Sequence, residues 1–409
     1  MIRFAFDSIL LFALVIPFIM AVRISPGNTP YWLFGIIFLG LLSYLILDVI
    51  KIAEKKYILL KDILLWGIII LVLGSSFASA IIFRHITHPI YQIHDMPLQQ
   101  EIAIRYLLDG KNPYATTYFG TILEQWHYSD TEINPALYHF VLPPFYIIFA
   151  LPFYFLSNQL LGYFDARIPL LFLFFVLLFI IAKLIHNPEK RRIFLSVLAF
   201  HPAMLLYTLE GRSDIFMFGF LALGLFLLHK EKYIIAGIPM ALAFAVKQSV
   251  WPIFPFYVAF LYFKTKNFQK TIFSLFPFVI TFAFAVLPFF FWDKKAFIES
   301  TVLYLSGSTG NSYPISGYGF GSFLHQIGVI KDVGAYYPFT IWQLVISLPI
   351  LIFLYKLLKK IPTVSMLIFC YGIFLFIFWY FSRYFNNSHV AYLSFIFITA
   401  YAWQNHNEK

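Results

Sequence analysis

Runs of about 20 apolar residues recur along the chain, and they limit its possible folds more than any other feature. A helix of that length crosses the roughly 30 Å of hydrocarbon in a bilayer. In hydrocarbon only helices and closed barrels satisfy their backbone polar groups, and continuous apolar runs favour helices over strands. Only 12% of the residues are charged, against about a quarter in soluble domains. The sequence therefore predicts an all-α polytopic membrane protein.

About twelve transmembrane helices are expected from these runs. The first run is too long for a typical signal-peptide core and has no convincing cleavage site, so we expect it to be retained. The single cysteine, Cys370, lies inside an apolar run, which excludes an intramolecular disulfide. The predicted spans are 4–22, 31–50, 62–83, 168–184, 193–209, 214–229, 233–249, 251–263, 271–291, 339–357, 362–381 and 389–404.

The distribution of charge predicts the orientation, because Lys and Arg favour cytoplasmic loops. With the N-terminus inside, 18 of the 29 Lys and Arg residues lie on the inner side, whereas 12 of the 19 Asp and Glu residues lie on the outer side. We therefore expect both termini to be cytoplasmic and the loops 84–167 and 292–338 to be non-cytoplasmic. The net charge of +10 then reflects topology and does not indicate nucleic-acid binding.

The loop 84–167, called the first loop below, interrupts the apolar runs with a long polar segment. After Asp95, the pattern LQQEIAIRYLL predicts a short amphipathic helix that ends at turn residues. Residues 138–156 are apolar, but a full span there would move every later basic cluster to the outer side. Three prolines also interrupt this stretch, so we expect it to be re-entrant or to lie at the membrane surface.

Four features on the outer side are candidates for one site. Asp95 is the first, with a helix N-cap or an ordinary loop acid as the alternative. The hairpin LEGRSDIF is the second; charges at the end of a span usually turn toward a cavity, although solvated turn residues are common. It carries Glu210, Arg212 and Asp214.

The third feature is Lys247-Gln248, which apolar residues flank on both sides. Its lysine either binds a lipid-borne phosphate or reaches for water at the interface. The fourth is the loop 292–338, called the second loop below, which is rich in Tyr, Gly and Ser and is either a mobile lid or an ordinary connector. The chain has none of the common nucleotide-binding motifs, and no Cys/His cluster predicts zinc.

The order of these motifs along the chain resembles the order found in the GT-C superfamily of integral-membrane glycosyltransferases. It is most similar to the order in the polyprenyl-phosphate-mannose-dependent mannosyltransferases. The resemblance covers roughly residues 62–263. It rests on the loop acid Asp95, the turn 110–114, the Pro- and Tyr-rich stretch 138–152, His201-Pro202 with the hairpin 210–214, and Lys247 followed by Trp251-Pro252.

The resemblance implies three parts: two extra N-terminal spans (1–61), a catalytic membrane module (62–263) and a variable module (264–409) that binds the acceptor. It implies inverting transfer of a hexose such as mannose from a polyprenyl-phosphate donor to a lipid-linked or glycan acceptor. The reaction would take place on the non-cytoplasmic face of a bacterial inner membrane or the ER membrane.

The resemblance also suggests roles for individual residues. Asp95 would be the general base, because an attacking hydroxyl must lose its proton. Lys247 and Arg212 would bind the donor phosphate, which gains negative charge as it leaves. Many relatives have paired acids where this chain has Asp95 alone, so no metal site is predicted and a divalent cation stays an open alternative. The expected substrate contacts are Glu210, Asp214, Gln248, Glu101 and Tyr114.

Two other functions remain open on the sequence. A lipid or glycan transporter or flippase would need repeated halves and ionisable groups near mid-membrane. A polymerase or ligase of lipid-linked glycans would rely on basic residues nearer the C-terminus, where the chain offers His325, Lys331 and Arg383.

Overall fold

The computed structural model describes residues 5–21, 30–127 and 133–404. Within these ranges the protein is mainly helical, and its only strands, β1 (Ser316–Gly317) and β2 (Tyr384–Phe385), form a short parallel pair. Four of the described helices are long and apolar enough to cross a membrane: α3 (Glu54–Ile86), α7 (Arg167–Leu184), α13 (Phe268–Trp292) and α17 (Phe339–Lys360).

Other helices, most of them shorter, occupy the remaining positions where spans are predicted. They are α1 (Phe6–Ala21), α2 (Tyr31–Ile46), α8 (Pro188–Ala199), α9 (Leu205–Leu209), α10 (Ser213–His229), α11 (Tyr233–Phe244), α12 (Phe254–Thr265), α18 (Val364–Tyr380) and α19 (Asn387–Gln404). α3 is longer than expected, so the predicted division at residue 61 falls inside a helix.

Two spans predicted as continuous are broken. The span 193–209 is divided into α8 and α9, with His201-Pro202 between them, since proline lacks the N–H that a helix interior needs. The span 233–249 ends at Phe244, and the chain resumes as the 3-10 helix η4 (Gln248–Ile253). Lys247 thus lies in a break between helices, where its backbone is extended (φ −154°, ψ 138°).

Apolar side chains cover much of the outer surface of the helices. On α13, Phe268 is 70% exposed and Phe284 is 83% exposed. Water would solvate such a surface at a high free-energy cost, whereas lipid chains cover it without one. The protein is a helical, multi-pass membrane protein.

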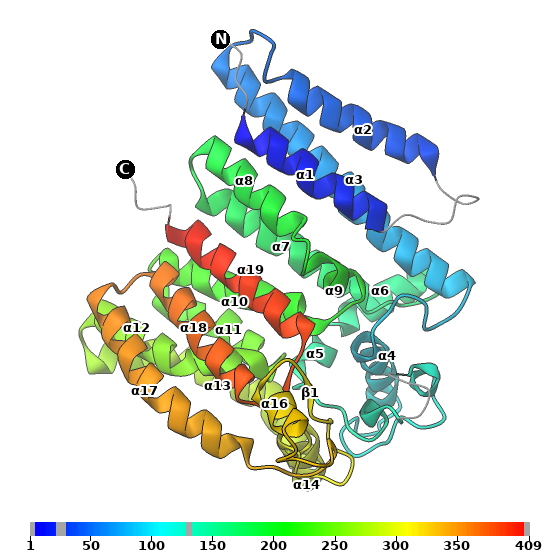
Figure 1. The fold of residues 1–409 in the computed structure, drawn as a ribbon, viewed down its shortest axis with the longest axis vertical. Coiled ribbons are helices and arrows are strands. Elements are labelled where there is room, and N and C mark those ends of the chain that lie inside the picture. Colours follow the sequence, from blue (N-terminus) through cyan, green and yellow to red (C-terminus); the bar gives the residue numbers. More distant parts are fainter. Residues whose placement is uncertain (1–4, 22–29, 128–132, 405–409) are drawn as a thin grey trace.

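The two long loops lie at the same end of the helices (Figure 1). The first loop carries α4 (Asp95–Leu108), α5 (Phe145–Ile148) and α6 (Leu151–Leu161), and the second carries α14 (Lys294–Ile298), α15 (Tyr304–Ser306) and α16 (Phe320–Gln326). The start of α1 and the end of α19 lie at the opposite end. The stretch 138–156 contains the short helices α5 and the beginning of α6 and no continuous span.

A buried ionic cluster joins the first three helices to the rest of the bundle. Lys61 of α3 lies 2.7 Å from Asp48 and 3.3 Å from Asp7 of α1. Asp7 also accepts hydrogen bonds from Tyr44 (2.7 Å) and from Nε of Arg192 in α8 (2.6 Å). Asp7 and Lys61 are fully buried, so each compensates the other's cost of leaving water.

Candidate functional site

Helix α4 of the first loop holds Asp95 at its first position, one residue inside the helix and not before it as expected. His94 is the N-cap, and its Nδ1 lies 2.5 Å from Asp95 Oδ1 and 3.3 Å from the Met96 nitrogen. At this distance the imidazole can donate from Nδ1 to the carboxylate, which directs Asp95 Oδ1 toward His94. Asp95 is 3% exposed and is held in a fixed orientation.

A network of buried charges fixes α4 against the bundle. Arg84, at the end of α3, donates to both oxygens of Glu101 at 2.7 Å and to Asp165 at 2.8 Å. Arg167, at the start of α7, donates from Nε and Nη2 to the two oxygens of Asp165, each at 2.8 Å. Such paired bonds between guanidinium and carboxylate groups fix orientation as well as distance. The acid at Asp165 and both arginines were not identified from the sequence.

The charges of this network are strongly stabilised. Burial by itself raises the pKa of the Asp165 carboxyl, but the Arg167 and Arg84 guanidinium groups outweigh it and hold that pKa well below its ordinary range. Glu101 also accepts the Ala166 N–H at 3.0 Å. Glu101, predicted as a substrate contact, therefore positions α4 and lies outside the cavity described below.

The hairpin 210–214 packs directly against the start of α4. Gly211 has φ +86°, and a side chain there would meet Pro97 at 2.8 Å, so only glycine allows this close approach. The His94 N–H donates to the Glu210 carbonyl at 2.8 Å. Arg212 Nε donates to Glu210 Oε2 at 3.1 Å, and its guanidinium lies 4.4 Å from the Tyr207 ring centre.

Lys247 and Asp214 form an ion pair beside this hairpin. Asp214 lies in the first turn of α10, and Lys247 Nζ approaches its Oδ1 at 2.7 Å. The helix N-terminus also favours a carboxylate at this position. Gln248 donates from Nε2 to the carbonyls of Val141 (2.7 Å) and Thr301 (3.1 Å), which joins the first and second loops.

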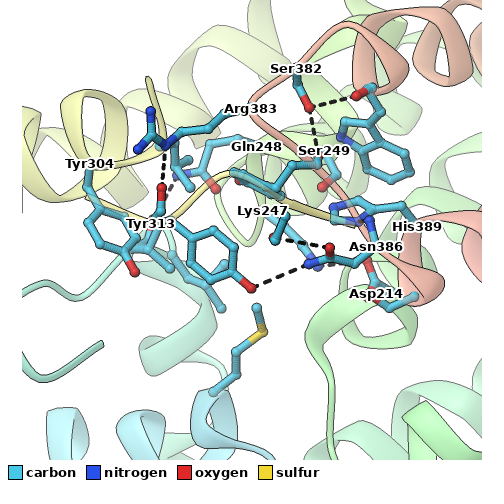
Figure 2. Close-up of a pocket in the computed structure, with 18 of the residues that line it drawn as sticks. Asp214, Lys247, Gln248, Ser249, Tyr304, Tyr313, Ser382, Arg383, Asn386 and His389 are labelled. Carbon is cyan, nitrogen blue, oxygen red and sulfur yellow. Dashed lines mark hydrogen bonds and ion pairs between the residues drawn. The ribbon is translucent and has the colours of Figure 1, made fainter. Parts of the chain in front are cut away.

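These side chains line a cavity of about 650 Å³ between the two loops and the helix ends. The predicted residues that line it are Asp95, Arg212, Asp214, Lys247 and Gln248. Figure 2 shows Lys247 and Asp214 pointing toward each other at its wall. The lining omits Glu101, Glu210 and Tyr114.

Tyr114 is buried in the packing of the first loop instead. Its hydroxyl donates to the Leu142 carbonyl at 2.8 Å, and its ring centre lies 4.8 Å from that of Phe297. Tyr114 thus holds the two loops together without facing the cavity.

The other half of the cavity comes from the second loop, which was the fourth candidate on the sequence, and from residues 379–389, of which the sequence singled out only Arg383. The second loop and the segment 379–389 meet here through the β1–β2 pair and through Arg383, which is 2% exposed. Arg383 donates to the carbonyls of Tyr313, Ala335, Val333 and Gly334. Further lining residues on this side are Tyr304, Tyr313, Trp379, Ser382, Tyr384, Asn386 and His389.

In the described ranges, no group of three or more His, Cys, Asp or Glu side chains could hold a metal ion. Of the two acids that line the cavity, Asp95 contacts His94 and Asp214 contacts Lys247. The site can therefore offer a carboxylate, two cations and neutral hydrogen-bonding groups to a ligand.

Comparison of the chain with protein-family models, curated proteins and solved structures finds no match.

Proposed function

We propose that this protein is a membrane glycosyltransferase with a GT-C-like arrangement of about twelve spans. It would move a hexose such as mannose from a polyprenyl-phosphate donor to an acceptor hydroxyl on the non-cytoplasmic face. One observation carries the proposal: a single cavity, at the loop end of an apolar helix bundle, is lined both by a buried loop carboxylate and by a lysine in a helix break.

The buried carboxylate of Asp95 acts as the general base. In an inverting transfer, the acceptor oxygen attacks the anomeric carbon, the bond from that carbon to the phosphate oxygen breaks, and the acceptor proton must leave. Asp95 accepts this proton on Oδ2, since Oδ1 faces His94 Nδ1 at 2.5 Å. The rigid attachment of α4 by the Arg84 network keeps the carboxylate in place, and a fixed geometry is what makes a base effective.

The cationic side chains of Lys247 and Arg212 bind the leaving phosphate. The phosphate gains negative charge as the bond to the sugar breaks, so fixed positive groups stabilise the transition state more than the ground state. Lys247 lies at the cavity wall with Asp214 as its partner, and Arg212 reaches the same cavity from the hairpin. The apolar outer surface of the neighbouring helices suits a polyprenyl chain that lies in the bilayer.

The test uses the full-length protein in lipid nanodiscs. Native mass spectrometry should detect a bound polyprenyl phosphate lipid, and a donor with a radiolabelled sugar should give labelled acceptor with the wild type and not with Asp95→Asn. A bound lipid without covalent transfer to any acceptor would instead favour a flippase and overturn the proposal. Retention of the anomeric configuration in the product would overturn the inverting mechanism.

A further inference from the structure

Helices α11 and α13 both begin at the end of the bundle opposite the two long loops. α10 runs from the hairpin 210–214 to His229, so α11 starts at that far end. α13 starts there too, because it ends at Trp292, next to the second loop. A side chain at Gly237 of α11 would meet the backbone nitrogen of Phe278 in α13 at 2.9 Å. The two helices are therefore parallel neighbours in direct backbone contact.

One turn nearer the starts of these helices, a groove of about 690 Å³ lies between them, called the α11–α13 groove below. Its walls include Ile234 and Ile235 of α11 and Phe273 of α13. The side chains of Ile235 and Phe273 are 55% and 62% exposed. Hydrocarbon covers such surface at a lower free energy than water does. The groove therefore suits an apolar chain where the helices enter the bilayer.

Two lysines line the same groove. Lys232 is the N-cap of α11, Lys270 lies in the first turn of α13, and both are exposed. Among the described residues, no carboxylate lies within ion-pair distance of either ammonium group. Lys247 differs in this respect, because Asp214 is its partner. Glu231 is the one acid among the lining residues, so the groove offers two unpaired cations against one acid.

The turns beside the groove are also basic. The turn between α10 and α11 carries Lys230 as well as Lys232, and the end of α12 and the turn after it carry Lys264 and Lys266. The sequence from Lys264 to Lys270 contains no acid. The summed charge at this end of the two helices therefore attracts an anion.

The combination of an apolar groove and unpaired lysines selects one kind of occupant. A free anion would use the lysines and leave the apolar walls uncovered, whereas an uncharged lipid would cover the walls and leave the lysines unpaired. A zwitterionic headgroup brings a cation of its own close to the lysines. Basic pockets between transmembrane helices are known to bind anionic lipid headgroups.

We infer that the α11–α13 groove binds one anionic phospholipid from the adjacent leaflet. Its phosphate lies against Lys232 and Lys270, and one acyl chain lies along the walls formed by Ile234, Ile235 and Phe273. This site is at the opposite end of the bundle from the cavity that holds Asp95, and the inference does not depend on sugar transfer.

The experiment titrates the delipidated full-length protein in detergent with lipid and counts bound molecules by native mass spectrometry. The two probes are phosphatidylglycerol and phosphatidylcholine with identical acyl chains, so that only the headgroup charge differs. Phosphatidylglycerol should fill one site at least tenfold more tightly than phosphatidylcholine. An excess of inorganic phosphate should not displace it, because the acyl chain contributes to binding.

Single substitutions separate the two parts of the groove. Lys232→Gln and Lys270→Gln should each weaken phosphatidylglycerol binding about fivefold, the usual scale for one basic residue at a membrane surface, and leave phosphatidylcholine binding unchanged. Glu231→Gln should act in the opposite direction and tighten phosphatidylglycerol binding. Phe273→Ala should weaken binding of both lipids alike, because it removes apolar wall. Lys359→Gln is the matched control, since Lys359 is an exposed lysine at the same end of the bundle and outside the lining.

Three results would overturn the inference. Equal affinity for the two lipids would show that the groove does not distinguish headgroup charge. Unchanged phosphatidylglycerol binding in both Lys232→Gln and Lys270→Gln, or an equal loss in Lys359→Gln, would show that the attraction is spread over the whole basic surface. Displacement of the lipid by inorganic phosphate would show a site for a free anion.

Discussion

Lys247 Nζ lies 2.7 Å from Asp214 Oδ1, so the cation expected to bind the donor phosphate already has an acidic partner. The two side chains are 13% and 6% exposed. A lysine that only reaches for water would point away from such a site. The pair holds the ammonium at the cavity wall and restricts its motion before a ligand arrives.

Replacement of Lys247 by methionine should weaken donor binding and reduce turnover, because methionine keeps the length of the side chain and removes the charge. The loss of turnover should exceed the loss of binding, since the leaving phosphate gains charge during the reaction. Donor affinity and transfer rate measure the two effects. Lys230→Met, at the opposite end of α10, is the control and should leave both unchanged.

The same substitution leaves Asp214 buried without its cation, which by itself destabilises the fold. Lys247→Met with Asp214→Asn removes both charges and should recover much of the thermal stability that Lys247→Met loses. If the double variant also recovers donor affinity, the phosphate is held by other groups and the assignment of Lys247 is wrong.

Asp95→Asn should reduce the transfer rate by a factor of roughly 10² or more, the usual scale for a lost general base. Donor affinity should stay close to that of the wild type, because the carboxylate acts on the acceptor. Glu124→Gln, in the same loop, is a control that removes an exposed acid outside the cavity lining. Transfer by Asp95→Asn at the wild-type rate would exclude Asp95 as the base and make Asp214 the next candidate.

Arg84 should matter for stability more than any exposed basic residue of the first loop. Arg84→Met leaves Glu101 buried without a cation and removes one of the two arginines of Asp165, so we expect a loss of about 3–5 kcal/mol in the free energy of unfolding. Lys111→Met, an exposed substitution in the same loop, should change it by less than about 0.5 kcal/mol. Denaturation of both variants in detergent measures the difference. Equal stabilities would mean that the network does not fix α4.

The helices were largely predictable because apolar length alone determines them. The amphipathic helix after Asp95 and the positions of α10, α13, α17 and α18 follow from local pattern. The breaks at His201-Pro202 and before Lys247 were both missed, since both lie within apolar sequence. Pro202 signals the first of these breaks, whereas residues 245–247, at the second, contain no proline.

Part of the candidate site was also predictable from local sequence, because charged residues beside apolar runs are easy to recognise. Asp95, Asp214 and Lys247 stand out as charges beside apolar runs, and they meet in one cavity. Glu101 has the same appearance in the sequence, but its Arg84 partner is 17 residues away and only the fold reveals the pair. The second loop was a candidate on its composition alone, and residues 379–389 are mostly common polar and aromatic residues that no sequence pattern distinguishes from those of an ordinary loop.

The free energy of unfolding of the protein should depend on pH through His139. This residue lines the cavity, and its Nδ1 lies 3.3 Å from Ser300 Oγ. Burial lowers the pKa of His139, and Glu299 opposes this only in part. The pKa of His139 in the folded protein is below its unfolded value of about 6.5. Neutral His139 therefore contributes to the free energy of unfolding above pH 6.5, and this contribution is lost as the pH falls through the folded pKa.

His139→Gln should therefore reduce the loss of unfolding free energy between pH 7 and pH 5, by at most about 1.4 kcal/mol per pH unit for one proton. His88→Gln, an exposed histidine in the same loop, is the control. Unfolding at several pH values measures the slope for each protein. A slope in His139→Gln equal to that of the wild type would show that His139 does not change its protonation on folding.

The orientation can be tested by cysteine labelling in a Cys370→Ala background, since Cys370 is buried in α18 and is the one native thiol. Lys111→Cys and Lys331→Cys place exposed thiols in the first and second loops, while Glu189→Cys and Gln269→Cys place them at the opposite end of the helices. Because basic residues favour the cytoplasmic side, an impermeant maleimide should label the first pair on intact cells. It should label the second pair only after the membrane is opened. Labelling of Glu189→Cys and Gln269→Cys on intact cells, with protection of the other two, would reverse the orientation and place the cavity on the cytoplasmic face.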